Sequence, residues 1–155
     1  STLPWNLRRN QRKNAPRSRK KTPARRHLHS RSGMGRLMLI DDNEVVVNLL
    51  KTLLEMEGFE IITNPQGDFL EAIQREEPDL ILMDVYLKDD AGRDVDGFQF
   101  LDAIRQNFNL SDTRIIMSSG IDFRAESKKR NANGFILKPY MPDDLIQLIN
   151  HVLAV

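Results

Sequence analysis

Five polar residues stand directly after short apolar runs of the chain. They are two neighbouring carboxylates, a third carboxylate, a hydroxyl and an amine: Asp41, Asp42, Asp84, Ser119 and Lys138. If the apolar runs are buried parallel strands, the carboxyl ends of those strands share one edge of the sheet, where ligands bind in such folds. We therefore expect the five side chains to meet at that edge.

The side chains expected at this edge favour phosphate chemistry assisted by a metal ion. Three carboxylates close together raise one another's pKa unless a cation is present. Mg²⁺ fits such a site, because it takes oxygen ligands and also binds phosphate oxygens; Mn²⁺ is an alternative. A lysine can contact one phosphoryl oxygen, and a serine hydroxyl can donate to another. Asp41 or Asp42 could also cap the helix that follows, which does not exclude metal binding.

The elements that must position these residues alternate along the chain from residue 36 onward. Strands are predicted at residues 37–40, 59–63, 79–83, 114–118 and 135–137. Helices are predicted from about residue 44 to Gly58, at 67–76, 97–107 and 143–153, with a short one at 124–131. Five strand–helix repeats imply right-handed crossovers. The fold class is therefore α/β, with a doubly wound five-stranded parallel sheet.

Two of the predicted helices have apolar faces that indicate which residues should be buried. The first helix presents Val46, Leu49, Leu50, Leu53 and Leu54. The helix at 97–107 presents Phe98, Leu101 and Ile104, followed by Phe108. We expect both sets to pack against the sheet.

The strand-end motifs together resemble those of the response-regulator receiver domain (CheY-like) of two-component signalling. The matching residues are Asp41-Asp42-Asn43, Asp84, Ser119-Gly120 and Lys138-Pro139-Tyr140, in the family's chain order. The resemblance covers residues 36–155. It implies a (βα)5 flavodoxin-like fold with strand order 2-1-3-4-5.

The resemblance also implies roles for individual residues. Asp84 would be the phosphoacceptor, whose carboxylate attacks the phosphorus of a phosphohistidine to form an acyl phosphate. Asp42, Asp84 and the backbone carbonyl of Tyr86 would bind Mg²⁺ directly, and Asp41 would bind it through water. Lys138 would contact the phosphoryl group.

Three further roles concern the switch that phosphorylation operates. Ser119 would move toward the phosphoryl group, and Phe135 would be the coupled aromatic side chain that turns inward. A cis peptide bond is expected before Pro139. Two alternatives stay open: Ser118 could carry the hydroxyl role, and Phe135 could simply be a core residue of its strand.

Two segments depart from the family pattern. Residues 86–95 make the loop after the phosphoacceptor about five residues longer than usual, and this loop has no proline. Its aspartates do not match the spacing of a Ca²⁺ loop, so we interpret it as a solvated insertion. The stretch from Ser119 to Lys138 is about three residues short, which predicts a short or irregular fourth helix.

Charge divides the chain into two parts. Of the 23 Lys and Arg residues, 12 lie at or before Arg36, whereas all 22 Asp and Glu lie after it. Residues 1–35 are predicted to be a disordered basic arm. The arm could contact phosphate backbones or an acidic partner, act as a transit segment, or be vector-derived. Contact with nucleic acid is expected only through it.

Other features limit the class of protein. There are no cysteines, and no apolar run approaches the roughly 20 residues of a membrane span, so we expect a cytoplasmic protein without membrane insertion. The chain stops after the last predicted helix, which favours a stand-alone receiver. It would accept phosphate from a histidine kinase or histidine phosphotransfer protein, in a phosphorelay or as a switch for an unknown downstream protein.

Two other classes of function remain as alternatives. One is a pseudo-receiver that serves only as a scaffold. The other is an aspartate-nucleophile phosphatase, which would need a second acid two residues after the nucleophile, where Tyr86 stands. We therefore expect a regulatory phosphoacceptor that catalyses only its own phosphorylation and dephosphorylation, rather than an enzyme.

Overall fold

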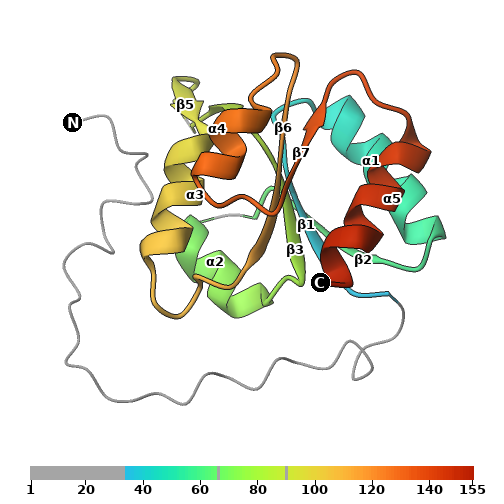
Figure 1. Ribbon diagram of the computed structural model, residues 1–155, viewed down its shortest axis with the longest axis horizontal. Coiled ribbons are helices and arrows are strands. Elements are labelled where there is room, and N and C mark those ends of the chain that lie inside the picture. The colour runs from blue at the N-terminus through green and yellow to red at the C-terminus, as the bar shows by residue number, and fades with distance from the viewer. Residues whose placement is uncertain (1–33, 66, 90) are drawn as a thin grey trace.

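The computed structural model describes residues 34–65, 67–89 and 91–155 (Figure 1). Nearly all of the predicted basic arm, residues 1–33, lies outside these ranges, so its interpretation stays a prediction. The described elements are β1 (Arg36–Ile40), α1 (Glu44–Met56), β2 (Glu60–Thr63), α2 (Phe69–Glu76), β3 (Leu80–Asp84), β4 (Tyr86–Lys88), β5 (Asp94–Asp96), α3 (Gly97–Gln106), β6 (Arg114–Ser119), α4 (Arg124–Lys129), β7 (Gly134–Leu137) and α5 (Pro142–Leu153).

The main sheet has five parallel strands in the order β2-β1-β3-β6-β7. Strands β4 and β5 form a separate antiparallel pair. With that pair left out, the order is the predicted 2-1-3-4-5, and the fold class is confirmed. Among the described residues, no helix is long and apolar enough to span a bilayer.

Helices cover both faces of the sheet, α1 and α5 on one and α2, α3 and α4 on the other (Figure 1). Successive side chains of a strand point to opposite faces, so each strand contributes to two cores. On β3, Ile81 and Met83 pack on the α2–α3 side. Leu80 and Leu82 pack on the α1–α5 side. Burial on both faces explains why the strands are continuously apolar.

Two helices begin at a capping side chain that the sequence analysis did not name. Helix α1 is capped by Asn43, whose side chain accepts a hydrogen bond from Val46 N at 3.2 Å, and not by Asp41 or Asp42. Helix α2 begins at Phe69 rather than at residue 67, because Asp68 accepts hydrogen bonds from the first free N–H groups. An N-cap marks the start of a helix in this way.

Two residues expected in the core are exposed. Phe108 is 82% exposed, because α3 ends at Gln106 and the apolar face does not continue beyond it. Leu49 is 58% exposed. The buried residues of α1 are Val47, Leu50 and Leu54, and Leu49 lies about 100° around the helix from Leu50.

The segment interpreted as a solvated insertion is exposed at most of its described residues, and it is folded as a hairpin of β4 and β5. Leu87 pairs with Val95 and is 5% exposed, with both side chains packed against the α2–α3 core. At the turn, Asp89 accepts hydrogen bonds from Ala91 N, Arg93 N and Arg93 Nε. Later in the chain, α4 has only six residues, which confirms the predicted short fourth helix.

Candidate functional site

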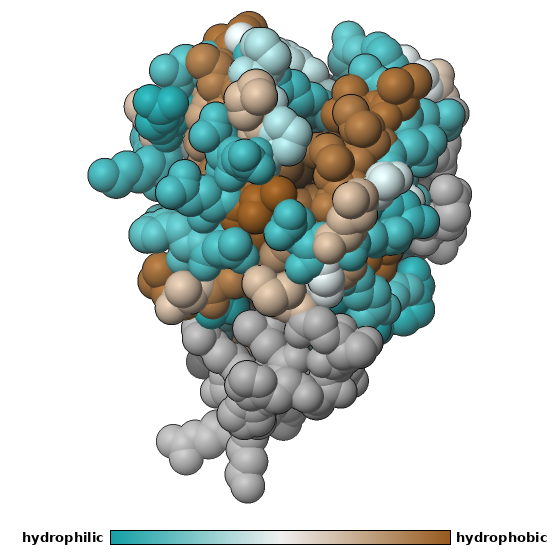
Figure 2. All heavy atoms as spheres, turned by 90° about the vertical axis from the view of Figure 1, so that its right-hand side faces the viewer, coloured by the Kyte–Doolittle hydropathy of each residue, from teal (hydrophilic) through white to brown (hydrophobic). Residues whose placement is uncertain are grey.

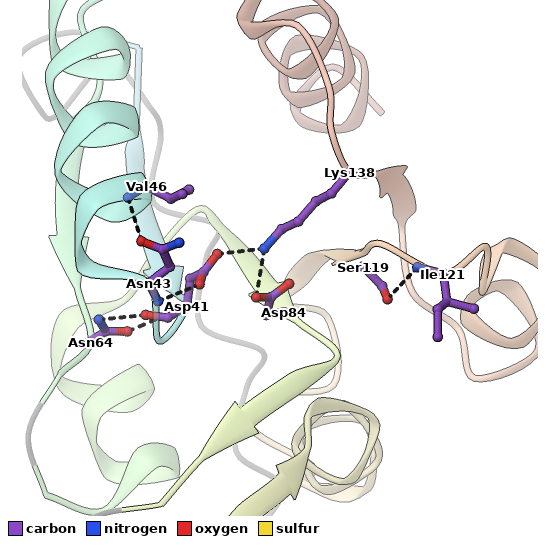
Figure 3. Close-up of polar contacts among 8 residues, drawn as sticks. All are labelled: Asp41, Asn43, Val46, Asn64, Asp84, Ser119, Ile121 and Lys138. Carbon is purple, nitrogen blue, oxygen red and sulfur yellow. Dashed lines mark hydrogen bonds and ion pairs between the residues drawn. The ribbon is translucent and has the colours of Figure 1, made fainter. Parts of the chain in front are cut away.

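Two carboxylates and one amine meet at the carboxyl ends of β1, β3 and β7. Lys138 Nζ donates hydrogen bonds to Asp84 Oδ2 at 2.8 Å and to Asp41 Oδ2 at 2.9 Å (Figure 3). The two carboxylate side chains are 12% and 13% exposed. The parallel sheet therefore brings together residues that are up to 97 positions apart.

These contacts change how readily each group holds a proton. Burial raises the pKa of Asp84 to about 6, although the hydrogen bond from Lys138 opposes this shift and the nearby Asp41 carboxylate adds to it. Burial alone would lower the pKa of Lys138, but its hydrogen bonds to the two carboxylates outweigh burial and raise it. The lysine is therefore charged, and it only partly compensates the two acids.

Asp42 lies at the exposed rim of the same site. Burial and the Asp41 charge raise the pKa of Asp42, whereas a hydrogen bond from the backbone N–H of Lys88 lowers it. Lys88 belongs to β4, and its side chain donates to Asp94 across the hairpin at 2.6 Å. The hairpin is thus an immediate neighbour of the acidic residues.

A glycine allows α3 to begin against the backbone of Asp84. A Cβ atom at Gly97 would lie 2.1 Å from the Asp84 carbonyl oxygen, so no larger residue fits there. Gly97 N donates to Val85 O at 2.6 Å, and Val85 N donates to Ser118 O at 2.9 Å. The end of β3 is therefore held from two sides.

Asn64, which the sequence analysis did not select, holds the loop that follows β1. Its side chain forms two hydrogen bonds with the backbone of Asp41 (Figure 3). Within the loop, Asn43 N donates to Asp41 Oδ1 at 2.9 Å. An Asn-Pro pair directly after a predicted strand is a turn signal that could have drawn attention to this position.

The residues expected to form the switch lie on β6 and β7. Ser119 is 2% exposed, and its Oγ accepts a hydrogen bond from Ile121 N at 3.1 Å, on the side away from Asp84 (Figure 3). The hydroxyl of Ser118 is buried without a hydrogen-bond partner. Phe135 is half-buried against the α2–α3 core. The Lys138–Pro139 peptide bond is cis, as predicted.

The oxygen atoms at this edge fit a hard cation. Asp41 and Asp84 share a single ammonium group, that of Lys138, so one positive charge faces two carboxylates. Carboxylate and carbonyl oxygens are the ligands that Mg²⁺ prefers. Within the described ranges, no three acidic or histidine residues are arranged as a ready-made metal cluster. The expected ligand set of Asp41, Asp42, Asp84 and the Tyr86 carbonyl therefore remains a prediction.

The fold and this acidic edge define a receiver domain of two-component signalling. The family model of the response regulator receiver domain matches residues 37–150, and the chain belongs to that family. It is 33% identical over 121 residues to the transcriptional regulatory protein GltR of Pseudomonas aeruginosa, covering 76% of this chain and 48% of GltR.

Two further relatives consist of little more than the matched region. Protein PilH of Pseudomonas aeruginosa is 26% identical, with 78% of this chain and 99% of PilH covered. The solved structure of the chemotaxis response regulator CheY4 of Vibrio cholerae has a TM-score of 0.66 at 25% identity, with 77% and 98% covered. By contrast, the chain spans about half the length of the first curated relatives that it matches.

Proposed function

We propose that this receiver accepts a phosphoryl group on Asp84 from a phosphohistidine of a histidine kinase or a phosphotransfer protein. The observation that carries the proposal is the pairing of Asp84 and Asp41 with Lys138 at one sheet edge. A carboxylate oxygen of Asp84 forms the new bond to phosphorus as the phosphorus–nitrogen bond breaks, and the leaving imidazole keeps the electron pair and takes up a proton.

Neighbouring residues have separate tasks in this reaction. Asp41, Asp42, Asp84 and the carbonyl of Tyr86 would hold Mg²⁺, which supplies positive charge for the phosphoryl oxygens. Lys138 is charged and within hydrogen-bonding distance of Asp84, so it can follow the negative charge from the carboxylate to the phosphoryl group.

The output of the reaction would be a change of conformation. In this state the Ser119 hydroxyl is engaged with the backbone of Ile121. A phosphoryl group on Asp84 offers it a stronger acceptor, and movement of Ser119 would make room for Phe135 to turn inward. The protein would then relay phosphate or signal to a downstream protein, and a cytoplasmic location belongs to the same proposal.

An exposed apolar surface beside the acidic edge supports docking of a partner protein. Val45 and Leu49 of α1 and Met141 before α5 are 78%, 58% and 67% exposed. Figure 2 faces the α1–α5 side and shows apolar residues gathered in its upper part. Gathered apolar side chains of this kind are common at protein–protein contact sites.

The test is intact-mass analysis after incubation with Mg²⁺ and phosphoramidate. We expect a gain of one phosphoryl group in the wild type and in the control Asp112→Asn, an exposed aspartate outside the acidic edge. Asp84→Asn should gain none, and chelation of Mg²⁺ should abolish the gain in all proteins. No gain in any protein would instead favour a scaffold that is never phosphorylated.

A further inference from the structure

We propose that Asn64 is a positioning residue for the acidic loop, residues 41–43, and holds it in the conformation that binds a divalent cation. The inference deepens the proposed function and rests on it in one respect, because it takes this loop to be part of the Mg²⁺ site. It assigns a task to a residue outside the strand-end motifs.

The backbone at Asn64 ends the pairing of β1 with β2. Asn64 N still donates to Leu39 O at 3.0 Å, as the next hydrogen bond of the parallel ladder. The chain then turns away, since Asn64 has a φ of 36° and is followed by Pro65, which has no N–H to donate. The backbone of β2 therefore provides no further partner for β1.

The side chain of Asn64 supplies the missing partner. Asp41 N donates to Asn64 Oδ1 at 3.2 Å, and Asn64 Nδ2 donates to Asp41 O at 3.0 Å (Figure 3). A planar amide offers one acceptor and a donor, as a peptide group does. Asparagine also tolerates positive φ better than most residues. The side chain thus extends the ladder by one residue, to Asp41.

This extension fixes the direction of the carboxylates. Both backbone polar groups of Asp41 are held by Asn64, while its side-chain oxygens face Asn43 N and Lys138 Nζ at 2.9 Å each. Asp42 is the next residue along the same backbone. Without the Asn64 amide, no described hydrogen bond would join the Asp41 backbone to β2, and the loop would have to be ordered when a cation binds.

The experiment compares Asn64→Gly with a matched control. Glycine removes the amide and still accepts a positive φ, so the backbone is not strained. The control is Asn131→Gly, because Asn131 is also exposed, has a φ of 64° and lies just after α4. Mg²⁺ is titrated into each unphosphorylated protein, and backbone amide signals are followed by NMR. Hydrogen exchange of the Asp41 amide is measured without metal.

For Asn64→Gly we expect the Mg²⁺ dissociation constant to rise about tenfold, as when partners that orient metal ligands are removed. The Asp41 amide should exchange faster, and the control should match the wild type in both measurements. If Asn64→Gly does not fold, Asn64→Gln, whose amide is displaced by one methylene, should show the same rise. An unchanged dissociation constant in the folded variant, or no Mg²⁺ response in the wild type, would overturn the inference.

These outcomes are separate from those that decide the proposed function. A wild type that gains no phosphoryl group, or an Asp84→Asn variant that still gains one, would refute the phosphoacceptor role but would leave a difference in Mg²⁺ affinity intact. Equal Mg²⁺ affinity would refute the role of Asn64 and leave phosphorylation intact.

Discussion

Lys138 is the residue on which the charge balance of the site depends. Its side chain is 29% exposed. Its ammonium group lies between two carboxylates whose side chains are less exposed still. Removing one partner from a largely buried ion pair is costly, because the remaining charge stays poorly solvated and unpaired. In this protein the loss would leave two such charges facing each other.

We predict that Lys138→Met lowers the free energy of unfolding of the metal-free protein by about 1–3 kcal/mol, less than for a fully buried pair. Urea unfolding in the presence of a chelator measures this change. The control is Lys51→Met, whose exposed ion pair with Glu55 spans 3.9 Å and should contribute less than about 0.5 kcal/mol. Adding Asp84→Asn to Lys138→Met should recover part of the loss, because it removes one of the two unpaired charges. A double variant no more stable than Lys138→Met would contradict this account.

Some residues of the site can be predicted from sequence and others cannot. Asp84 and Lys138 were predictable because each directly follows a continuous apolar run, and parallel strands align their carboxyl ends. For Asn64 the Asn-Pro pair signals a turn, but the sequence does not tell that its side chain reaches the backbone of Asp41. Gly97 was not predictable, since nothing in the sequence tells how closely α3 approaches Asp84.

At the scale of elements, the β4–β5 hairpin is a part of the described structure that the sequence did not predict. It joins β3, the strand that ends at Asp84, to α3. Tyr86 and Phe98 both contact the ring of Phe123 ahead of α4, at centroid distances of 6.1 and 5.7 Å. The length of the loop alone could not predict this structure. Strands of three residues are too short for a pattern of alternation to be recognised.

We predict that Leu87→Ala lowers the free energy of unfolding by about 2–4 kcal/mol, because Leu87 fills space in the α2–α3 core. The measurement is urea denaturation, and the control is Phe108→Ala, an exposed side chain whose loss should change stability by less than about 0.5 kcal/mol. Equal, small effects of both substitutions would mean that the hairpin is only loosely attached.

At the scale of the whole molecule, charge is unevenly distributed. All 22 acidic residues lie after Arg36, whereas 12 of the 23 Lys and Arg residues lie at or before it. The parallel main sheet was predictable because its strands alternate with helices along the chain, and the strand order was implied by the resemblance to the receiver family. The burial of individual residues near helix ends, such as Phe108, was not, because helix ends depend on capping contacts.

We predict that a chain beginning at Met34 is phosphorylated at the same rate as the full chain, since every residue assigned to the site lies in the retained part. Any binding of the 155-residue chain to duplex DNA at low salt should weaken steeply with added salt and be lost in the shortened chain. Intact-mass kinetics and fluorescence anisotropy measure the two properties. A slower phosphorylation of the shortened chain would show that the arm takes part in the reaction.

The close approach of Gly97 to the Asp84 carbonyl restricts how the end of β3 can move. Since α3 begins against this carbonyl and β6 holds the next residue, the backbone of Asp84 cannot shift without displacing two elements. We therefore expect Asp84 to be the stationary point of the domain. If Asp84 is phosphorylated, we expect the segments that carry Ser119 and Lys138 to move relative to it. These segments lie at the carboxyl ends of β6 and β7, so the conformational change would occur on that side of β3.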